Sequence, residues 1–241
     1  MARVVLAIGH HDHDPGAVAN GTTEHAEVKA VVEAVQKELQ QDSVEVFIPP
    51  TSLTLPEKIQ WINQYFTADD FVIEIHLNSS ADPAPTGVST WYCDGKDPER
   101  KVSEYFANAL SMRMNLKNMG AKPDTANRHG RLGIVRDTIP HSWLFEVGFI
   151  SHADDLEKFR RKGVSAIKEC VTDLFLGGNP LLPAEAVWPF RDVPPSHFAF
   201  EAIKKAKGKG VISGYENQIF RPNSGITRGE MLVLLERLGS L

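Results

Sequence analysis

Residues 4–17, VVLAIGHHDHDPGA, decide the fold because they join a buried strand to a polar loop at its carboxyl end. The first five residues are apolar without a break, which predicts a short buried strand, and Gly9 marks the exit of the backbone from the sheet. Three histidines and two aspartates follow between His10 and Asp14. Ligands of open α/β sheets bind at the carboxyl ends of the strands, so this loop is the first candidate for a functional site.

The rest of the first 176 residues alternates between apolar runs and amphipathic segments, which predicts an α/β fold. Expected strands cover residues 44–48, 71–75, 88–92 and 142–149, and expected helices cover 24–41, 55–66, 102–116 and 154–176. Helices between successive strands favour parallel pairing, so we expect a twisted, mostly parallel sheet with helices on both faces. Residues 119–131 follow neither period and contain Gly120, Pro123 and Gly130, which predicts a long loop.

A segment rich in glycine and proline divides the chain. The run GGNP at residues 177–180, followed by Pro183 and Pro189, is typical of a linker and predicts a boundary near residue 178. We expect an α/β domain over residues 1–178, then a linker and a small helical module over residues 179–241. In this module Thr227 is the expected N-cap of a helix, with Glu230 as its capping-box partner. A unit of about 55 residues buries little apolar area, which favours stabilisation by a partner copy.

Composition argues against several classes of protein. The net charge of −5 comes from well-mixed charges, which is not the basic face of a nucleic-acid-binding protein. No run approaches the roughly 18 apolar residues of a membrane span. The apolar run after Arg3 is too short for the core of a signal peptide, so we expect synthesis in a cytoplasm without Sec export. Cys93 and Cys170 are far apart and are predicted to be free thiols in a reducing compartment.

Two histidines and a glutamate form a candidate zinc site. His10 and His76 each follow a predicted buried strand, and the ends of parallel strands meet at one edge of a sheet. Glu24 begins the first predicted helix, directly after the loop that starts at His10. Catalytic zinc is typically held by three such ligands, with an open position for water. Glu146 lies in the apolar strand 142–149, where burial would raise its pKa, and is the candidate general base.

Each of these residues also has a purely structural interpretation. A histidine at a strand end is often a hydrogen-bonded structural residue, and Glu24 alone would be an acid favoured by the helix dipole. Glu146 alone would be explained as a buried salt-bridge partner. The coincidence of metal-type or acid/base residues at three strand exits on one predicted edge favours the catalytic interpretation.

Other catalytic patterns are incomplete. The run from His11 to Asp14 is similar to the H-x-H-x-D-H run of binuclear metallo-β-lactamase-like hydrolases, but Pro15 and Gly16 replace its last two residues. The serines after His76 lack a G-x-S-x-G elbow, and no thiol-protease signature surrounds the first cysteine. The remaining histidines are interpreted as solvent-facing or as surrounding the metal site without binding it. These residues are His11, His13, His25 and His129.

Four ordered motifs carry a resemblance to a known family. They are GHHDHDPGA at 9–17, GTTE at 21–24, EIHLN at 74–78 and FEVGFIS at 145–151. In order and spacing they resemble the zinc-dependent N-acetylmuramoyl-L-alanine amidases of the amidase-3 type, over roughly residues 1–176. The resemblance implies that His10, Glu24 and His76 hold one zinc ion and that Glu146 is catalytic.

The chain departs from this family at the loop after the first ligand. His11 and Asp12 stand where the family usually has two glycines, which bears on loop flexibility and substrate approach. Glu27, one helical turn after Glu24, is a competing carboxylate ligand. The Gly-x-x-Glu spacing favours Glu24.

The resemblance implies hydrolysis of the amide that joins the lactyl group of N-acetylmuramic acid to the L-alanine of the stem peptide in peptidoglycan. Zinc would polarise the carbonyl and acidify its bound water. Glu146 would take the water proton and later deliver it to the leaving amine. Asn78 and Arg136 are candidates for contact with substrate, and are equally explained as a loop-stabilising amide and a solvated charge.

The end of the chain resembles one S-layer homology motif, a module that anchors proteins to secondary polymers of Gram-positive walls. The resemblance runs from Phe190 to Met231, with TRGE at residues 227–230 where Thr-Arg-Ala-Glu is usual. By analogy, Asp192 and Arg228 are candidates for binding the wall polymer. Most such anchors carry three motifs, so the single copy is expected to bind polymer alone, to bind through oligomers, or mainly to pack on the enzyme.

We therefore interpret the sequence as a two-domain enzyme that degrades the cell wall. The expected lack of export favours a phage or prophage endolysin, made in the host cytoplasm and released through a holin to reach the wall. A mother-cell or prophage-derived autolysin is the alternative. A non-catalytic wall-binding protein is a third interpretation, against which the complete set of His10, Glu24, His76 and Glu146 argues.

Overall fold

The computed structural model describes residues 3–42, 44–127, 130–176, 190, 192–193, 197–215 and 219–239. These residues fall into two compact units, the first ending at Phe175 and the second containing the described residues from 190 onward. The predicted boundary near residue 178 lies outside the described residues, as does His129. Among the described helices, none has the length and apolar character that a membrane span requires.

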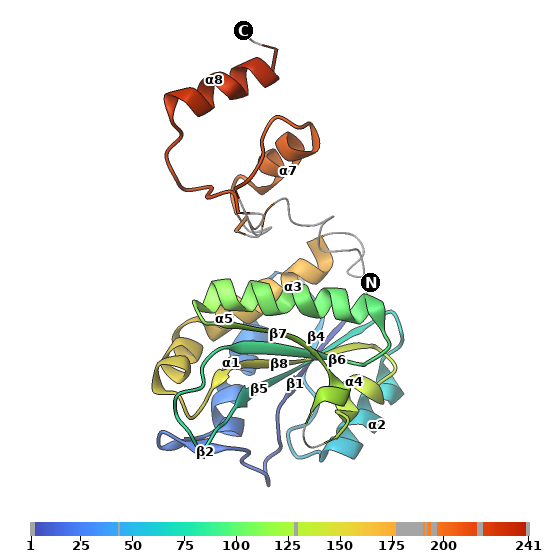
Figure 1. Cartoon of the computed structure of the whole chain (residues 1–241). Helices are drawn as coiled ribbons and strands as arrows, with labels where there is room; N and C mark the ends of the chain where they lie inside the picture. Colours follow the sequence, from blue (N-terminus) through green and yellow to red (C-terminus); the bar gives the residue numbers. More distant parts are fainter. Residues whose placement is uncertain are drawn as a thin grey trace. The chain divides into compact units, whose positions relative to one another are not determined.

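The first unit is built around a six-stranded sheet (Figure 1). Its strands are β1 (Val4–Ile8), β4 (Val46–Phe47), β5 (Phe71–Asn78), β6 (Val88–Tyr92), β7 (Asn118–Pro123) and β8 (His141–Phe149). They lie in the order β4-β1-β5-β8-β6-β7. The first four strands of this order are parallel, whereas β6 is antiparallel to β8 and parallel to β7. The expected mostly parallel sheet is confirmed.

Helices cover both faces of this sheet. They are α1 (Glu24–Gln41), α2 (Leu55–Tyr65), α3 (Asp97–Met114), α4 (Gly133–Arg136) and α5 (Ala153–Leu176). Phe106 of α3 packs edge-to-face on Phe145, with ring centroids 4.9 Å apart. Leu144, the preceding residue of β8, instead clusters with Ile62 of α2 and Ile134 of α4. Neighbouring residues of a strand point to opposite faces, so α3 and the α2/α4 pair lie on opposite sides.

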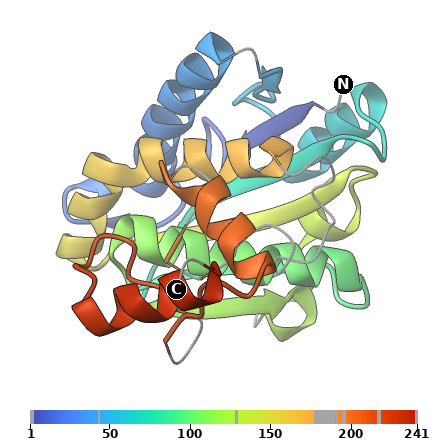
Figure 2. The same cartoon turned by 90° about the horizontal axis from the view of Figure 1, so that it is seen from above.

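Helix α5 lies between α1 and α3 (Figure 2). Lys168 of α5 pairs at 2.9 Å with Asp42, the C-cap of α1, and Asp173 of α5 pairs at 2.7 Å with Arg113 of α3. Cys170 is buried on the same helix, and both Cys93 and Cys170 are free, as predicted. Their cellular compartment stays a prediction.

The expectation of a long loop over residues 119–131 is wrong. Asn118–Pro123 forms β7, followed by the 3-10 helix η1 (Asp124–Ala126). The β6–β7 register shifts between Val88 and Thr90, and Gly120 at this irregularity has a φ of 84°. A glycine at a bulge and a proline at the end of the strand interrupt the alternation of apolar and polar residues that would predict a strand. Both residues are tolerated because β7 is an edge strand.

Two short elements also lie outside the predicted ones. A small hairpin of β2 (Val18–Ala19) and β3 (Thr22–Thr23) precedes α1, and the four-residue α4 precedes β8. Each is too short to repeat a hydrophobic period, so sequence patterns do not reveal it.

The second unit contains α7 (Phe200–Gly208) and α8 (Arg228–Arg237). Thr227 accepts a hydrogen bond from the backbone of Glu230, whose carboxylate accepts one from Thr227 N, so the predicted capping box is confirmed. The aromatic rings of Phe190 and Phe220 stack with centroids 4.9 Å apart. None of the residues of α8 is buried, which agrees with the small core expected of this unit.

Candidate active site

His10, Glu24 and His76 meet at the carboxyl ends of β1 and β5. His10 Nε2 lies 3.0 Å from Glu24 Oε2, and His76 Nδ1 lies 2.8 Å from Glu24 Oε1. One ligand atom from each residue lies within 4.8 Å of the other two. Glu24 is buried and the two histidines are half-buried. Two imidazoles and one carboxylate around a common point match the donor set of a catalytic zinc ion.

The close approach of β1 and β5 depends on Gly9. Its N–H donates to Ile75 O at 3.0 Å, which continues the parallel pairing of the two strands by one residue. A Cβ atom at Gly9 would lie 2.7 Å from His76 Nδ1 and equally close to Ile75 O. The next residue, His10, has a φ of 64° in the left-handed region. Strained backbone of this kind is typical of functional sites.

Hydrogen bonds fix both the start of α1 and the carboxylate of Glu24. Thr23 caps α1 by accepting a hydrogen bond from Ala26 N. The carboxylate of Glu24 accepts hydrogen bonds from Ala17 N at 3.2 Å and Leu77 N at 3.1 Å. Burial opposes its ionisation, but the hydrogen bonds with the two histidines hold the pKa of Glu24 well below its ordinary value. The carboxyl group is therefore an anionic ligand.

The competing acid Glu27 is engaged elsewhere. Its carboxylate accepts a hydrogen bond from Thr22 Oγ1 at 2.7 Å and pairs with Arg160 at 2.9 Å. The structure therefore brings Glu24, and not Glu27, to the two histidines.

Glu146 lies beside His76 on the neighbouring strand, because the register of the β5–β8 pair places the two residues opposite each other. Its Oε2 atom is buried and has no hydrogen-bond partner among the residues that the structure describes. Burial raises the pKa of Glu146 to about 7. A buried carboxyl oxygen without a partner points to a functional role, and a pKa near neutrality suits a general base.

A carboxylate also lies beside the ring nitrogen of each histidine that faces away from Glu24. His10 Nδ1 lies 2.9 Å from Asp14 Oδ2, and His76 Nε2 lies 3.2 Å from Glu74 Oε2. Each imidazole therefore presents its other nitrogen to Glu24, as in metal sites with a carboxylate–histidine pair. Sequence reasoning missed Asp14 and Glu74 as partners. The signal for Glu74 was its place two residues before His76, on the same face of the strand.

Other histidines of the opening loop lie around the site. His25 is buried, with Nδ1 3.0 Å from Gly9 O and Nε2 3.4 Å from Asp12. His13 is exposed, and its backbone N–H donates to His11 Nδ1 at 3.2 Å. Neither His11 nor His13 belongs to the group around Glu24, and their non-ligand roles stay a prediction.

The two candidate substrate contacts have local partners. Asn78 Oδ1 accepts a hydrogen bond from Ser79 N at 2.8 Å at the end of β5. Arg136 forms two hydrogen bonds of 2.6 Å with Asp124, whose side chain is fully buried. The pairing of Asn78 fits a loop-stabilising amide. Arg136 is not a solvated charge, because it forms an ion pair with a buried aspartate. Contact of either residue with substrate stays a prediction.

The described residues contain a second group of metal-type side chains, at His152, Asp154 and Asp155. Asp155 accepts hydrogen bonds from the backbone N–H groups of Gly87 and Phe149, both at 3.0 Å. Asp154 is exposed. We therefore interpret this group as a structural clamp between α5 and the ends of β6 and β8.

Asp192 and Arg228 belong to the second unit. Asp192 accepts hydrogen bonds from Phe220 N at 2.7 Å and Arg221 N at 2.5 Å. Arg228 is exposed at the start of α8. Their binding of wall polymer stays a prediction.

Comparison with solved structures identifies related folds. The catalytic domain of CwlV, an N-acetylmuramoyl-L-alanine amidase from Bacillus (Paenibacillus) polymyxa var. colistinus, aligns with a TM-score of 0.62 and 23% identity over 72% of this chain and 97% of that chain. The catalytic domain of the CD27L endolysin targeting Clostridia difficile aligns with a TM-score of 0.60 and 20% identity over 74% of this chain and 99% of that chain. At these identities, the likeness shows the fold.

Among curated relatives, the outer membrane protein SlpA of Thermus thermophilus is 41% identical over 49 residues. This match covers 20% of the chain and spans only 5% of the length of that relative. The S-layer homology domain model matches residues 189–232. The N-acetylmuramoyl-L-alanine amidase model of the Amidase_3 family matches residues 4–173. The chain therefore belongs to the Amidase_3 family of N-acetylmuramoyl-L-alanine amidases and carries an S-layer homology domain after the amidase domain.

Proposed function

We propose that the chain is a zinc-dependent hydrolase of the amide bond between N-acetylmuramic acid and L-alanine in peptidoglycan. The observation that carries this proposal is the convergence of His10 Nε2, the Glu24 carboxylate and His76 Nδ1, with Glu146 opposite His76. Membership of the amidase family supports the substrate class.

The residues divide the chemistry among them. A zinc ion bound by His10, Glu24 and His76 would supply Lewis-acid polarisation of the substrate carbonyl and a water of lowered pKa. Glu146 would accept a proton from the attacking water as the water oxygen adds to the carbonyl carbon, a role that suits a carboxyl group with a pKa near neutrality. The same carboxyl group then delivers the proton to the nitrogen of L-alanine as the amide bond breaks. Asp14 keeps the imidazole of His10 in the tautomer that leaves Nε2 free for metal.

The products of wall digestion test this proposal. Purified cell walls treated with the full chain should gain new L-alanine amino termini without new reducing sugar ends. Chelation should stop the release, and added zinc should restore it. New reducing ends without amino termini would identify a glycosidase instead. Absence of any release by the zinc-loaded chain would favour the non-catalytic wall-binding alternative.

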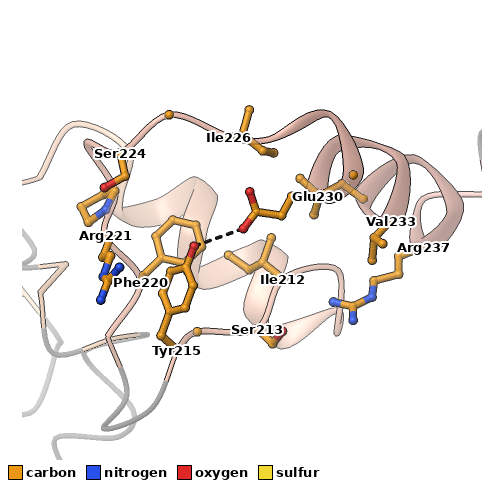
Figure 3. A pocket seen from close by; sticks show the side chains of 15 residues that line it. Ile212, Ser213, Tyr215, Phe220, Arg221, Ser224, Ile226, Glu230, Val233 and Arg237 are labelled. Carbon is orange, nitrogen blue, oxygen red and sulfur yellow. Dashed lines mark hydrogen bonds between the residues drawn. The ribbon is translucent and has the colours of Figure 1, made fainter.

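For the second unit we propose binding of a secondary cell-wall polymer, supported by its match to the S-layer homology domain. A pocket of about 520 Å³ lies between α8 and the preceding segment (Figure 3). Tyr215 and Arg221 line it, with the Arg221 guanidinium 4.7 Å from the centre of the Tyr215 ring. Asp192 accepts a hydrogen bond from Arg221 N and so shapes this pocket from outside. Arg228 is exposed, and we propose that it contacts polymer directly.

For the biological role we propose an endolysin, made in the cytoplasm and acting on the wall after the membrane is opened. Its fold is shared with the catalytic domain of an endolysin, which supports this proposal. Expression of the intact chain inside a susceptible host should cause lysis only when a pore-forming protein is also present. Lysis without that protein, or export of the chain by growing cells, would favour the autolysin alternative.

A further inference from the structure

We propose that the buried ion pair of Lys58 and Glu74 positions His76 and strengthens its binding of the metal ion. This inference rests on the proposed zinc site and assigns a role to two residues that do not touch the ion. It concerns positioning residues, because neither side chain reaches the point where the three ligand atoms meet.

The first observation is a continuous chain of polar contacts that ends at a ligand. Lys58 Nζ lies 2.7 Å from Glu74 Oε1, and Glu74 Oε2 lies 3.2 Å from His76 Nε2. The other ring nitrogen, His76 Nδ1, faces Glu24. With the proton on Nε2, the imidazole donates to Glu74 and keeps its lone pair on Nδ1, toward the metal site. A carboxylate in this position also makes the imidazole a more basic ligand.

The second observation is that Lys58 connects both ligand-bearing strands. Its ammonium also donates a hydrogen bond to Ile8 O at 2.6 Å, at the last residue of β1 and two residues before His10. One side chain of α2 therefore contacts β1 beside the first histidine and β5 beside the second. An ammonium group has three donors, so a single lysine can serve both contacts.

The third observation is burial. Lys58 and Glu74 are each only 4% exposed. Desolvation makes a buried ion pair a weak source of net stability, and well-packed apolar residues often replace one without loss. Stabilisation of the fold alone therefore gives little physical reason for a buried ion pair at this place. Its contact with a metal ligand supplies that reason.

The two histidines differ in the exposure of the carboxylate beside them. The carboxylate beside His10 belongs to Asp14, whose side chain is 49% exposed, so water screens its charge. The carboxylate beside His76 belongs to Glu74, which is enclosed and pairs with the Lys58 ammonium. We therefore expect the Glu74 contact to matter more for metal binding than the Asp14 contact.

Zinc affinity measured by competition with a chromophoric chelator tests the inference on the full chain. Glu74→Gln should weaken zinc binding by about 10- to 100-fold, the usual effect of losing such a carboxylate. Lys58→Met should also weaken it. The double variant should lose less than the product of the two single effects, because both changes interrupt the same chain of contacts. Asp14→Asn should weaken binding by less than Glu74→Gln.

Asp70→Asn is the matched control, since it breaks the other ion pair at the opposite end of β5, between Asp70 and Arg3. It should leave zinc affinity unchanged. Unchanged affinity in a folded Glu74→Gln variant, or an equal loss in Asp70→Asn, would overturn the inference. Failure of the unmodified chain to bind zinc would instead reject the proposed function.

A measurement on the unmodified chain tests the inference even if the variants do not fold. Nitrogen NMR shifts of His76 in the zinc-loaded protein should show the proton on Nε2 and the metal on Nδ1. A proton on Nδ1 would contradict the inference whatever the variants do.

Discussion

His76 on β5 and Glu146 on β8 lie directly opposite each other in a parallel strand pair. Neighbouring strands are about 4.8 Å apart, so the sheet itself sets the separation between the proposed zinc ligand and the proposed general base. Their side chains lie on the sheet face that α2 and α4 cover, the face from which Lys58 reaches Glu74. The proposed catalytic geometry is therefore set by the pairing of two strands in the central sheet.

Glu146→Gln should lower the rate of L-alanine amino-terminus release by about 10²- to 10⁴-fold, because the amide cannot accept the water proton. Zinc content should stay at the level of the unmodified chain, since Glu146 lies outside the ligand set. Glu27→Gln is the control, because Glu27 pairs with Arg160 instead. Equal release by the Glu146 variant would remove this residue from its proposed role.

Gly16→Ala should impair zinc binding. Gly16 has a φ of 66°, and a Cβ atom there would collide with the ring of His10 and lie 2.9 Å from Glu24 Oε2. Gly21 has a similar φ of 74° with nothing within 4 Å of the added atom. Both variants should lose about 1 kcal/mol of stability from backbone strain. Only Gly16→Ala should lose zinc, and equal zinc content in the two proteins would contradict the proposed ligand positions.

Asp70→Asn should remove a stabilisation that depends on pH. Burial opposes ionisation of Asp70, but hydrogen bonds from Arg3 and Thr67 outweigh it and lower the pKa to about 2, from 3.8. The ionised carboxylate therefore stabilises the fold above pH 4, and this contribution is lost as the pH falls through about 2. Its size is about 2 kcal/mol, from the pKa difference.

Urea unfolding at several pH values checks this prediction. The difference in unfolding free energy between the unmodified chain and Asp70→Asn should be largest near pH 6 and should shrink toward pH 2. The neighbouring exposed acid Asp69, changed to Asn, is the control and should have little effect. A difference that grows as the pH falls would have the wrong sign for this ion pair.

Arg228→Ala should weaken binding of the chain to walls that carry secondary polymer, without changing its fold. Asp192→Ala should weaken binding by loosening the backbone at Phe220 and Arg221, and should therefore also lower the unfolding temperature of the second unit. Sedimentation with walls, before and after chemical removal of the polymer, measures both effects. Binding that does not depend on the polymer would reject the proposed partner.

Much of the first unit was predictable because its hydrophobic periods are regular. The helix over residues 24–41 has the same bounds in the structure, and the expected convergence of His10 and His76 follows from parallel pairing of β1 and β5. The elements that the sequence did not predict either interrupt a hydrophobic period or are too short to show one. β7 is an example, since Gly120 and Pro123 break its alternation.

The contacts around the ligands were less predictable. The helical period of the sequence predicts the face of α2 on which Lys58 lies, but not the residue with which it pairs. Its contact with Glu74 depends on how α2 packs on the sheet. The choice of Glu24 over Glu27 rested on motif spacing until the structure showed Glu27 paired with Arg160. Side-chain pairing across elements is therefore the part that required three-dimensional coordinates.

The most direct test of the central claim is a crystal structure of the zinc-loaded chain, with anomalous scattering recorded at the zinc edge. We expect one zinc ion bonded to His10 Nε2, a Glu24 oxygen and His76 Nδ1, at about 2.0 to 2.2 Å from each. Glu146 should lie close to the open position without binding the ion. Zinc at His152, Asp154 and Asp155, with none at Glu24, would contradict the account.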